Sequence, residues 1–408
     1  MRTVLAFGLL SSALAGLATA STKEERQSAW GIFQAAKENI VSKCIYKPKA
    51  EEVVSGALIA LAKELGPGNA QYFPGKMTGS IDEAMAAYVG AIRTLEDNLH
   101  IPIKTLVARS IRDYCRSIDR YSDYDDFDLW NRINEAGRFN YVGIGTALFE
   151  RAGEGFLLNP FPDGPAERAG IVSGDYLLEV NGSSVKGMSK VEVFAACLGK
   201  EGTNVEVKVQ HADNTVEIMK VIRERMTTSP LVVEHTASGM HVACHGEITN
   251  RAVEDLRTLL RSQRSGENLT LDLRGCPGGT VDAAVNFASL FLPADTLIGK
   301  LETVNGQEKL ISTNKTPYHP LKLVILQDRF TASAAELVIA ALVSNRSVSA
   351  ETRGERTYGK GVTQRQVEIF ADDKGTPAGI LSITDARVYG PKNEVWDGEG
   401  LPPTAEAK

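Results

Sequence analysis

The sequence predicts an α/β protein in which a mixed core is joined to a small β-rich module and to a helical N-terminal region. Two strand-turn-helix units, at residues 269–292 and 321–344, each place an apolar run before a turn and a helical pattern. Residues 139–226 hold several short runs separated by turn glycines, which is typical of strands. Apolar residues at helical spacing predict N-terminal helices over residues 49–65, 80–99 and 101–118.

The start of the chain predicts export. Arg2 precedes an apolar run and Ala18-Thr-Ala is a small-residue cleavage site, so residues 1–20 are expected to be a signal peptide. A retained N-terminal anchor is the alternative. No other apolar stretch approaches the roughly 18 residues of a membrane span, so we expect no stable span. The bacterial periplasm is the expected location, with secretion as the other choice.

Composition excludes several classes of function. Of the 408 residues, 43% are hydrophobic and 24% charged, which is a globular balance. The net charge is −6 and the basic residues are dispersed, so no nucleic-acid partner is expected. His241 and His245 lie on a strand-like run, where this spacing does not bring them together, and no CxxC or HExxH motif occurs. We therefore expect no metal and no cofactor.

Residues 21–138 are predicted to be helical. Ser80 and Glu83 can form a capping box, and Pro102 suits a first helical turn. The sequence leaves the role of this region open between dimerisation, a partner contact and packing beside the β-rich module.

Ser333 lies on the predicted turn between the run at residues 321–326 and the helix at residues 334–344. A hydroxyl in this place faces the free N–H groups and the positive end of the helix dipole, which favour the negative charge of an attacked carbonyl oxygen. No histidine lies nearby in the sequence, so a serine nucleophile needs another base.

Lys360 is the candidate base, and it must be uncharged to accept a proton. Burial in an apolar pocket disfavours the charged form of a lysine. Gly359 and Gly361 allow a tight turn around it, and Gln364 could hold its amine by a neutral hydrogen bond. For a lone serine or lysine, the simpler interpretation is a helix cap at Ser333 and a solvated loop lysine at Lys360.

Two motifs favour the catalytic interpretation of Ser333 and Lys360 over the structural one. Thr331-Ala-Ser-Ala-Ala-Glu-Leu and Gly354-Glu-Arg-Thr-Tyr-Gly-Lys-Gly-Val-Thr-Gln resemble the catalytic motifs of the carboxy-terminal processing peptidases, which are tail-specific serine proteases with a Ser-Lys dyad. The resemblance implies a crotonase-like β/α protease core with Ser333 as nucleophile, Lys360 as general base and Gln364 as the residue that orients the lysine. Ala335 stands where the family usually has a second serine, and the Ser-to-Lys separation is about two residues longer than usual.

A glycine-rich turn follows the run at residues 269–274. Asp272-Leu-Arg-Gly-Cys-Pro-Gly-Gly resembles the family segment that supplies an oxyanion-hole amide, and it matches neither a dinucleotide fingerprint nor a P-loop. The resemblance implies that the N–H of Gly279, with Gly278 as second choice, acts with the N–H of Ala334. Glycines that only make a turn are the alternative.

The β-rich module resembles the circularly permuted PDZ domain of these proteases, on the segments Tyr141-Val-Gly-Ile-Gly-Thr-Ala-Leu and Asn159-Pro-Phe-Pro-Asp-Gly-Pro-Ala-Glu-Arg-Ala-Gly. A PDZ domain binds an extended peptide by strand addition and captures its terminal carboxylate in backbone N–H groups. The resemblance implies a carboxylate loop made by Tyr141, Val142, Gly143, Ile144 and Gly145. A PDZ fold kept only as scaffold or lid is the alternative.

The five cysteines of an exported chain invite pairing. Cys44 with Cys115 is the first expectation and Cys244 with Cys276 the second, which leaves Cys197 free. Buried free thiols are the alternative, because sequence does not determine connectivity.

Together these observations predict a signal peptide at residues 1–20, a helical region at 21–138, an inserted-type PDZ domain at 139–226 and a serine protease core at 227–408. The expected function is a serine endopeptidase that binds protein or peptide substrates with accessible C-termini, with an activating adaptor or a homo-oligomer as further partners. A non-catalytic PDZ-containing adaptor or ligand carrier of the same fold is the alternative.

Overall fold

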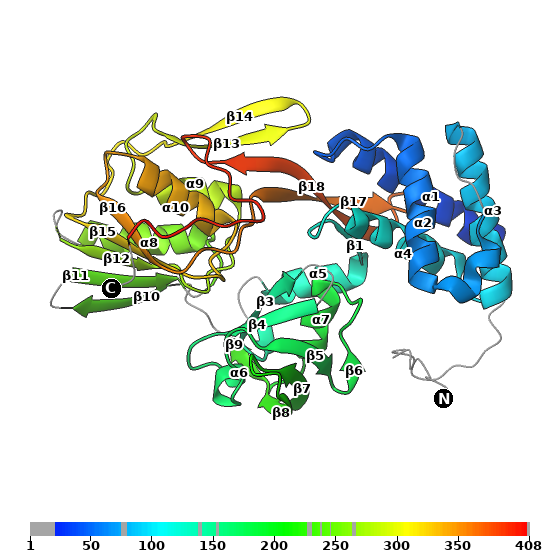
Figure 1. Cartoon of the computed structure of the whole chain (residues 1–408), viewed down its shortest axis with the longest axis horizontal. Coiled ribbons are helices and arrows are strands. Elements are labelled where there is room, and N and C mark those ends of the chain that lie inside the picture. The colour runs from blue at the N-terminus through cyan, green and yellow to red at the C-terminus, as the bar shows by residue number, and fades with distance from the viewer. Residues whose placement is uncertain are drawn as a thin grey trace.

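The structure is a computed structural model, and it describes residues 21–74, 80–137, 141–151, 155–226, 231–236, 239–244, 246–262 and 267–405. The expected signal peptide and His245 lie outside these ranges. In Figure 1 the N-terminal helices, the β-rich module and the core form three separate groups of elements, and the long strands β17 and β18 run between the core and the helices.

The core is a five-stranded sheet in the order β10-β11-β12-β15-β16. The strands from β11 onward are parallel, and β10 pairs antiparallel with β11 at one edge. The strands and helices of this part are β10 (Leu231–Thr236), β11 (Gly239–Cys244), α8 (Asn250–Ser262), β12 (Leu269–Asp272), α9 (Val281–Ser289), β15 (Leu323–Gln327), α10 (Ala334–Ser344) and β16 (Ala350–Gly354).

Both strand-turn-helix units expected from the sequence are confirmed, as β12 with α9 and β15 with α10. Helix α10 covers the expected residues, whereas α9 ends at Ser289, before the expected residue 292. The helix ends early because the N–H groups of Leu290 and Phe291 bond to carbonyls three residues back and Pro293 follows, so the last turn tightens and stops.

A second sheet connects the core to the N-terminal helices. Its order is β1-β18-β13-β14, and β17 pairs with β18. Its strands are β1 (Asp123–Asp126), β13 (Leu297–Thr303), β14 (Gly306–Ile311), β17 (Val362–Phe370) and β18 (Pro377–Tyr389). Three residues of this sheet, Ile369, Leu381 and Ile383, are buried in one apolar cluster with the helices. The helices therefore pack against β17 and β18, the strands that follow Lys360 in the chain.

The helical region contains α1 (Lys23–Lys43), α2 (Ala50–Leu65), η1 (Pro67–Tyr72), α3 (Ile81–Leu99), α4 (Ile103–Ile118) and α5 (Phe127–Gly137). The three helices expected from periodicity are confirmed as α2, α3 and α4. The capping box of Ser80 and Glu83 is formed, while Pro102 occupies the N-cap of α4. The sequence patterns did not single out α1, whose buried face consists mainly of alanine and isoleucine.

The β-rich module has the sheet order β3-β4-β5-β7-β8, with β6 beside β5 and a separate pair β2-β9. Its elements are β2 (Tyr141–Gly143), β3 (Thr146–Arg151), β4 (Gly155–Pro160), α6 (Pro165–Arg168), β5 (Tyr176–Val180), β6 (Ser183–Ser184), α7 (Lys190–Cys197), β7 (Asn204–Gln210), β8 (Val216–Ile222) and β9 (Glu224–Met226). It has its own apolar core, in which Val193 of α7 packs against residues such as Leu158 and Val207.

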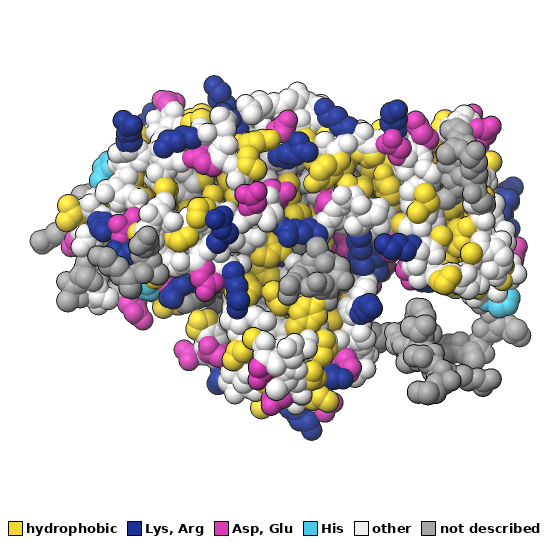
Figure 2. All heavy atoms as spheres, viewed as in Figure 1, with side chains coloured by type: hydrophobic (Ala, Val, Ile, Leu, Met, Phe, Trp, Pro, Cys, Tyr) yellow, Lys and Arg dark blue, Asp and Glu magenta, His cyan; other side chains and the backbone are white. Residues whose placement is uncertain are grey.

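Charged side chains of both signs are interspersed over the face shown in Figure 2, which is the distribution expected from the sequence. Within the described ranges, no helix combines the length and the apolar character needed to cross a bilayer.

Candidate active site

The turn that carries Ser333 and the glycine-rich turn open at the same edge of the core sheet. Ser333 follows β15 and the glycine turn follows β12, and these strands are parallel neighbours. The carboxyl ends of parallel strands are the usual location of sites in open α/β sheets. Asp328 joins the two turns, because its carboxylate accepts the N–H of Gly275 at 3.0 Å.

Ser333 has a backbone conformation that a residue other than glycine rarely adopts. Its φ is 55° and its ψ is −118° at the N-cap of α10. Such a residue persists only when its surroundings fix it, and it costs on the order of 1–3 kcal/mol. Thr331 provides one restraint, since its hydroxyl donates to the carbonyl of Leu273 at 2.8 Å. The turn therefore presents the serine at the helix N-terminus in a strained, fixed shape.

Gly278 packs directly on this serine. A Cβ added at Gly278 would lie 2.7 Å from the Cβ of Ser333 and 2.9 Å from the backbone nitrogen of Ala334. Only glycine allows this approach, because φ at Gly278 is also 102°.

The N–H of Gly279 is directed away from the neighbouring segment. The carbonyl of Gly278 accepts the N–H of Ile248 at 2.6 Å, and the C=O and N–H of a trans peptide point in opposite directions. Neither Gly279 nor Ala334 donates its N–H to another described residue. Two unused donors therefore lie beside Ser333, in the pair of residues expected to form an oxyanion hole.

Lys360 sits in a tight loop between β16 and β17. The N–H of Gly361 donates to Asp397 at 3.0 Å, and the indole N–H of the buried Trp396 donates to the carbonyl of Lys360 at 3.2 Å. A Cβ at Gly361 would lie 2.8 Å from the Cβ of Asp397. The two glycines that flank the lysine thus allow the close contact that fixes the backbone of the loop.

Glu336 joins the serine turn to the lysine loop. Its carboxylate accepts the N–H of Ser333 at 2.7 Å, the N–H of Lys360 at 2.8 Å and the N–H of Gly359 at 2.8 Å, together with the hydroxyl of Thr357 at 2.6 Å. The side chain is fully buried, and burial raises its pKa to about 7 although the four donors lower it. Ser333 and Lys360 donate to the same oxygen, so their backbone nitrogens lie within the reach of a lysine side chain.

Glu336 is not among the site residues predicted from the sequence. A signal was present, because Ser333 followed three residues later by a glutamate is a capping-box pattern.

The amine of Lys360 lies on an aromatic ring from the N-terminal region. Its Nζ is 4.8 Å from the centroid of the Tyr121 ring. Burial lowers the pKa of Lys360 to about 8, and the positive charges of Lys190 and Arg120 act in the same direction. Arg120 also donates to the carbonyl of Gly359 at 3.0 Å, so the segment after α4 contacts both the backbone and the amine of the lysine loop.

The hydrogen bonds expected from the sequence for the lysine amine are absent among the described residues. Nζ of Lys360 bonds neither to the hydroxyl of Ser333 nor to Gln364, and the amide nitrogen of Gln364 is buried without a hydrogen-bond partner. The physical reason is the position of the amine on Tyr121. The structure therefore brings together the backbones of the expected dyad, while Nζ of Lys360 and Oγ of Ser333 form no hydrogen bond.

The β-rich module touches this site through aromatic residues. The Phe149 ring of β3 lies 5.0 Å from the ring of Phe330, three residues before Ser333, and 5.6 Å from the ring of Tyr358, two residues before Lys360. The hydroxyl of Tyr358 donates to the carbonyl of Glu150. Strand β3 therefore contacts both the turn that carries Ser333 and the loop that carries Lys360.

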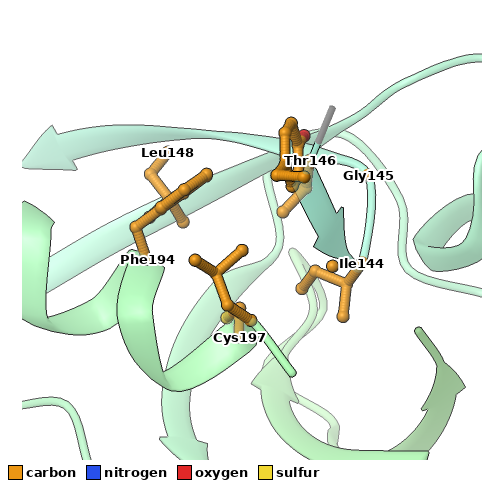
Figure 3. A pocket seen from close by; sticks show the side chains of 9 residues that line it. Ile144, Gly145, Thr146, Leu148, Phe194 and Cys197 are labelled. Atoms are coloured by element: carbon orange, nitrogen blue, oxygen red, sulfur yellow. The ribbon is translucent and has the colours of Figure 1, made fainter. Parts of the chain in front are cut away.

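A pocket opens between α7 and the start of β3, as Figure 3 shows. Four of the five residues expected for the carboxylate loop line it, namely Tyr141, Gly143, Ile144 and Gly145, whereas Val142 does not. The remaining walls are Thr146, Leu148, Phe194, Cys197 and Leu198. These walls were not predicted from the sequence, because the pocket exists only after α7 packs beside β3.

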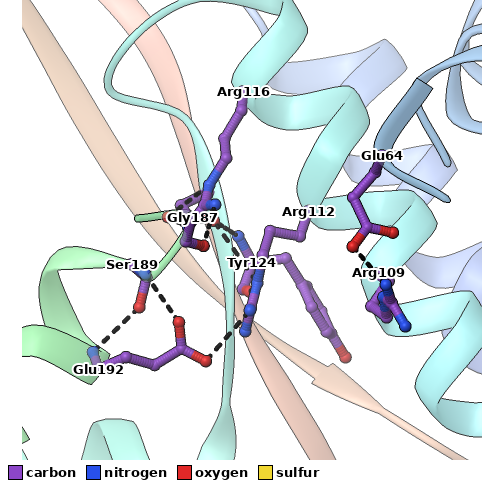
Figure 4. A network of polar contacts seen from close by, with 9 residues as sticks. Glu64, Arg109, Arg112, Arg116, Tyr124, Gly187, Ser189 and Glu192 are labelled. Atoms are coloured by element: carbon purple, nitrogen blue, oxygen red, sulfur yellow. Dashed lines mark hydrogen bonds and ion pairs between the residues drawn. The ribbon is translucent and has the colours of Figure 1, made fainter. Parts of the chain in front are cut away.

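The other end of α7 is attached to the helical region, as Figure 4 shows. Arg112 of α4 forms an ion pair with Glu192 at 3.1 Å. Arg116 forms one with Asp123 at 3.0 Å and donates to the carbonyl of Gly187 at 2.8 Å. The helix that lines the pocket is therefore in contact with the same region that supplies Tyr121.

All five cysteines are buried free thiols, so the pairs considered from the sequence are not joined in this structure. Within the described ranges, no group of three or more histidine, cysteine, aspartate or glutamate side chains could hold a metal ion.

Comparison with known proteins identifies two domains. Residues 241–407 match peptidase family S41, and residues 160–211 match the PDZ domain. The carboxy-terminal processing protease CtpA of Bacillus subtilis (strain 168) is 30% identical over 74% of this chain and 64% of its own length. A probable CtpA-like serine protease of Staphylococcus aureus (strain COL) is 30% identical over 70% of this chain and 56% of its own. The chain thus spans less than two thirds of the length of these relatives.

Among solved structures, a photosystem II D1 C-terminal processing protease superposes with a TM-score of 0.68 over 95% of this chain and 94% of that one, at 20% identity. This likeness concerns the fold. The family resemblance on which the sequence analysis relied is confirmed by the matching domains.

Glu336→Gln is expected to lower the free energy of unfolding by about 2–4 kcal/mol, because an amide presents a donor to backbone N–H groups that then lose their acceptor. Urea unfolding at pH 8.5, where the carboxylate is ionised, measures this loss. Glu355→Gln, an exposed carboxylate in the adjacent segment, is the matched control and should change stability by less than about 0.5 kcal/mol. Equal stability of the two variants would show that Glu336 does not hold the loops.

Proposed function

Because the chain carries a peptidase family S41 domain joined to a PDZ domain, we propose that it is a serine endopeptidase that captures the C-terminal tail of a protein substrate and cleaves a peptide bond nearby. The observation that supports this most is the strained Ser333 turn, which lies beside two unused N–H donors and is tied by Glu336 to the loop of a lysine of lowered pKa. Each of these features serves acyl transfer, and a structural helix cap requires none of them.

In the proposed reaction, the neutral amine of Lys360 takes the proton of the Ser333 hydroxyl while the oxygen attacks the scissile carbonyl. The N–H groups of Gly279 and Ala334 bind the oxyanion that forms. The lysine then returns the proton to the leaving amine, and an acyl-enzyme remains. Water, activated by the same amine, releases the product. Gln364 holds the amine in line with the hydroxyl.

The position of the amine on Tyr121 represents a resting conformer in this proposal. Catalysis requires the Lys360 side chain to rotate from the ring toward Ser333, while Glu336 keeps both backbones in place. The amide of Gln364 forms no hydrogen bond with the amine here, and its Nε2 is buried without a partner. After rotation, the amine can donate to the amide oxygen of Gln364, which leaves the lone pair of the amine free to take the proton of Ser333.

The pocket between α7 and β3 is the proposed site for the substrate tail. Its walls are apolar at Leu148, Phe194 and Leu198, which favours an apolar side chain at the end of the tail. The N–H groups of Ile144 and Gly145 donate to no other described residue, so they can receive a terminal carboxylate. A peptide bound in this pocket would contact β3. The same strand carries Phe149, which contacts Phe330 in the Ser333 turn and Tyr358 in the Lys360 loop.

Export through residues 1–20 is also part of this proposal, and sequencing the N-terminus of the mature protein tests it. A mature chain that still begins at Met1 would contradict it. The limits of the PDZ domain at 139–226 and of the protease core at 227–408 are proposed with it.

Ser333→Ala and Lys360→Ala are each expected to lower turnover of an unfolded substrate with an apolar C-terminus by at least about 10³-fold, because each removes a reacting group. Product formation by the full chain is followed by mass spectrometry. Lys374→Ala changes an exposed lysine in the turn after β17 and serves as the control that keeps its activity. Unchanged turnover in pure Ser333→Ala protein would exclude Ser333 as the nucleophile, and no turnover by the unaltered chain would leave the non-catalytic adaptor as the better interpretation.

The pH dependence of kcat/KM is expected to follow the amine of Lys360. The base is the neutral form and its pKa is about 8, so the rate should rise with pH about tenfold per unit below pH 8 and level off above it. Lys190→Ala removes a positive charge that lowers this pKa and should shift the profile to higher pH, whereas the exposed Lys186→Ala should not. A rate that does not change between pH 6 and 9 would exclude Lys360 as the base.

A further inference from the structure

Two cysteines meet behind the glycine turn. Cys244 is the last residue of β11, and Cys276 lies in the turn that follows the neighbouring parallel strand β12. Both thiols donate to the carbonyl of Gly246, at 3.4 Å from Cys244 and 3.3 Å from Cys276. Both residues are at most 1% exposed. A hydrogen bond with Cys244, together with burial, raises the pKa of the Cys276 thiol well above its ordinary value.

Cys276 is part of the turn that carries the proposed oxyanion donors. Its carbonyl accepts the N–H of Ala332 at 3.0 Å, which joins it to the residue before Ser333. On the other side, the carbonyl of Gly278 accepts the N–H of Ile248, four residues after Cys244. The turn is therefore held between the serine turn and the segment that follows β11, and hydrogen bonds alone make both connections.

The arrangement is specific to this pair among the five cysteines. Cys44 and Cys115 are also buried within one apolar cluster, but neither thiol shares an acceptor with another thiol in the described ranges. Cys197 lines the peptide pocket. Of the five cysteines, only Cys244 and Cys276 donate to the same carbonyl oxygen. Because Cys276 is part of the glycine turn, a bond between these two cysteines would link that turn to the end of β11.

We propose that Cys244 and Cys276 form a redox pair, whose oxidation to a disulfide ties the glycine turn to the end of β11 and holds the Gly279 N–H in place for catalysis. The catalytic part of this inference rests on the proposed function. A disulfide at this point would hold the glycine turn against the end of β11, in addition to the hydrogen bonds that already hold it. A preorganised N–H donor stabilises an oxyanion better than a mobile one.

The oxidant is a small disulfide such as oxidised glutathione. A thiolate of one cysteine attacks it and releases one glutathione thiol, and the second cysteine then attacks the mixed disulfide and releases another. Two S–H bonds are lost and one S–S bond forms, while one glutathione disulfide is reduced to two thiols. Because both thiols are buried, exchange is slow in the folded chain and fast while the chain folds.

The full chain, refolded either with oxidised and reduced glutathione or with an excess of reductant, tests the inference. A nonreducing peptide map should show a bond between Cys244 and Cys276. The oxidised form should have a Tm higher by at least about 5 °C, since the bond closes a long loop, and a kcat at least twofold higher. Cys244→Ala should abolish both differences, while Cys115→Ala, which changes a buried cysteine outside this site, should retain them.

Absence of the bond from the map, or an equal Tm in the two forms, would overturn the redox pair. A formed bond with equal kcat would overturn its catalytic role. If neither form hydrolyses any substrate, the proposed function fails, and the map and the Tm still decide whether the pair exists, because neither depends on turnover.

Discussion

The buried carboxylate of Glu336 is the interaction on which the site depends. The serine turn follows β15 and the lysine loop follows β16, so no short stretch of chain fixes one against the other. Glu336 does so by accepting N–H groups from Ser333, Gly359 and Lys360 in a place closed to water. Burying a charge is costly unless hydrogen bonds compensate it, and here the four donors that compensate it include the backbone N–H groups of Ser333 and Lys360.

Because Glu336 fixes the backbones of Ser333 and Lys360, the proposed reaction requires only the side chain of Lys360 to change its position. The amine of Lys360 lies on Tyr121, a residue from the N-terminal region, while its expected partners Ser333 and Gln364 remain without it. The same region is bound to α7 through Arg112 and Glu192, and β3 reaches the catalytic loops through Phe149. The pocket between α7 and β3 is therefore connected to the surroundings of Lys360 by two sets of contacts, one through α7 and the helical region and one through β3 and Phe149.

Much of this arrangement could be predicted from the sequence, because its signals are local. The apolar runs, the turn glycines and the helix pattern after Ser333 identify both strand-turn-helix units, and the family motifs identify Ser333, Lys360 and the glycine turn as candidates. What could not be predicted depends on packing between distant segments. Tyr121 lies far from Lys360 in the chain, and nothing in either local pattern indicates that β18 brings the helical region against the lysine loop. Glu336 was within reach of prediction, but its capping pattern does not reveal that a second loop would share it.

The most direct test is a crystal structure of the full chain with an apolar peptide boronate bound covalently to Ser333. The bonds from Glu336 to the N–H groups of Ser333 and Lys360 should remain, with the lysine amine moved off Tyr121 and within hydrogen-bond distance of the Ser333 oxygen and the amide of Gln364. An amine that stays on the Tyr121 ring while the boronate occupies the site would contradict a lysine base.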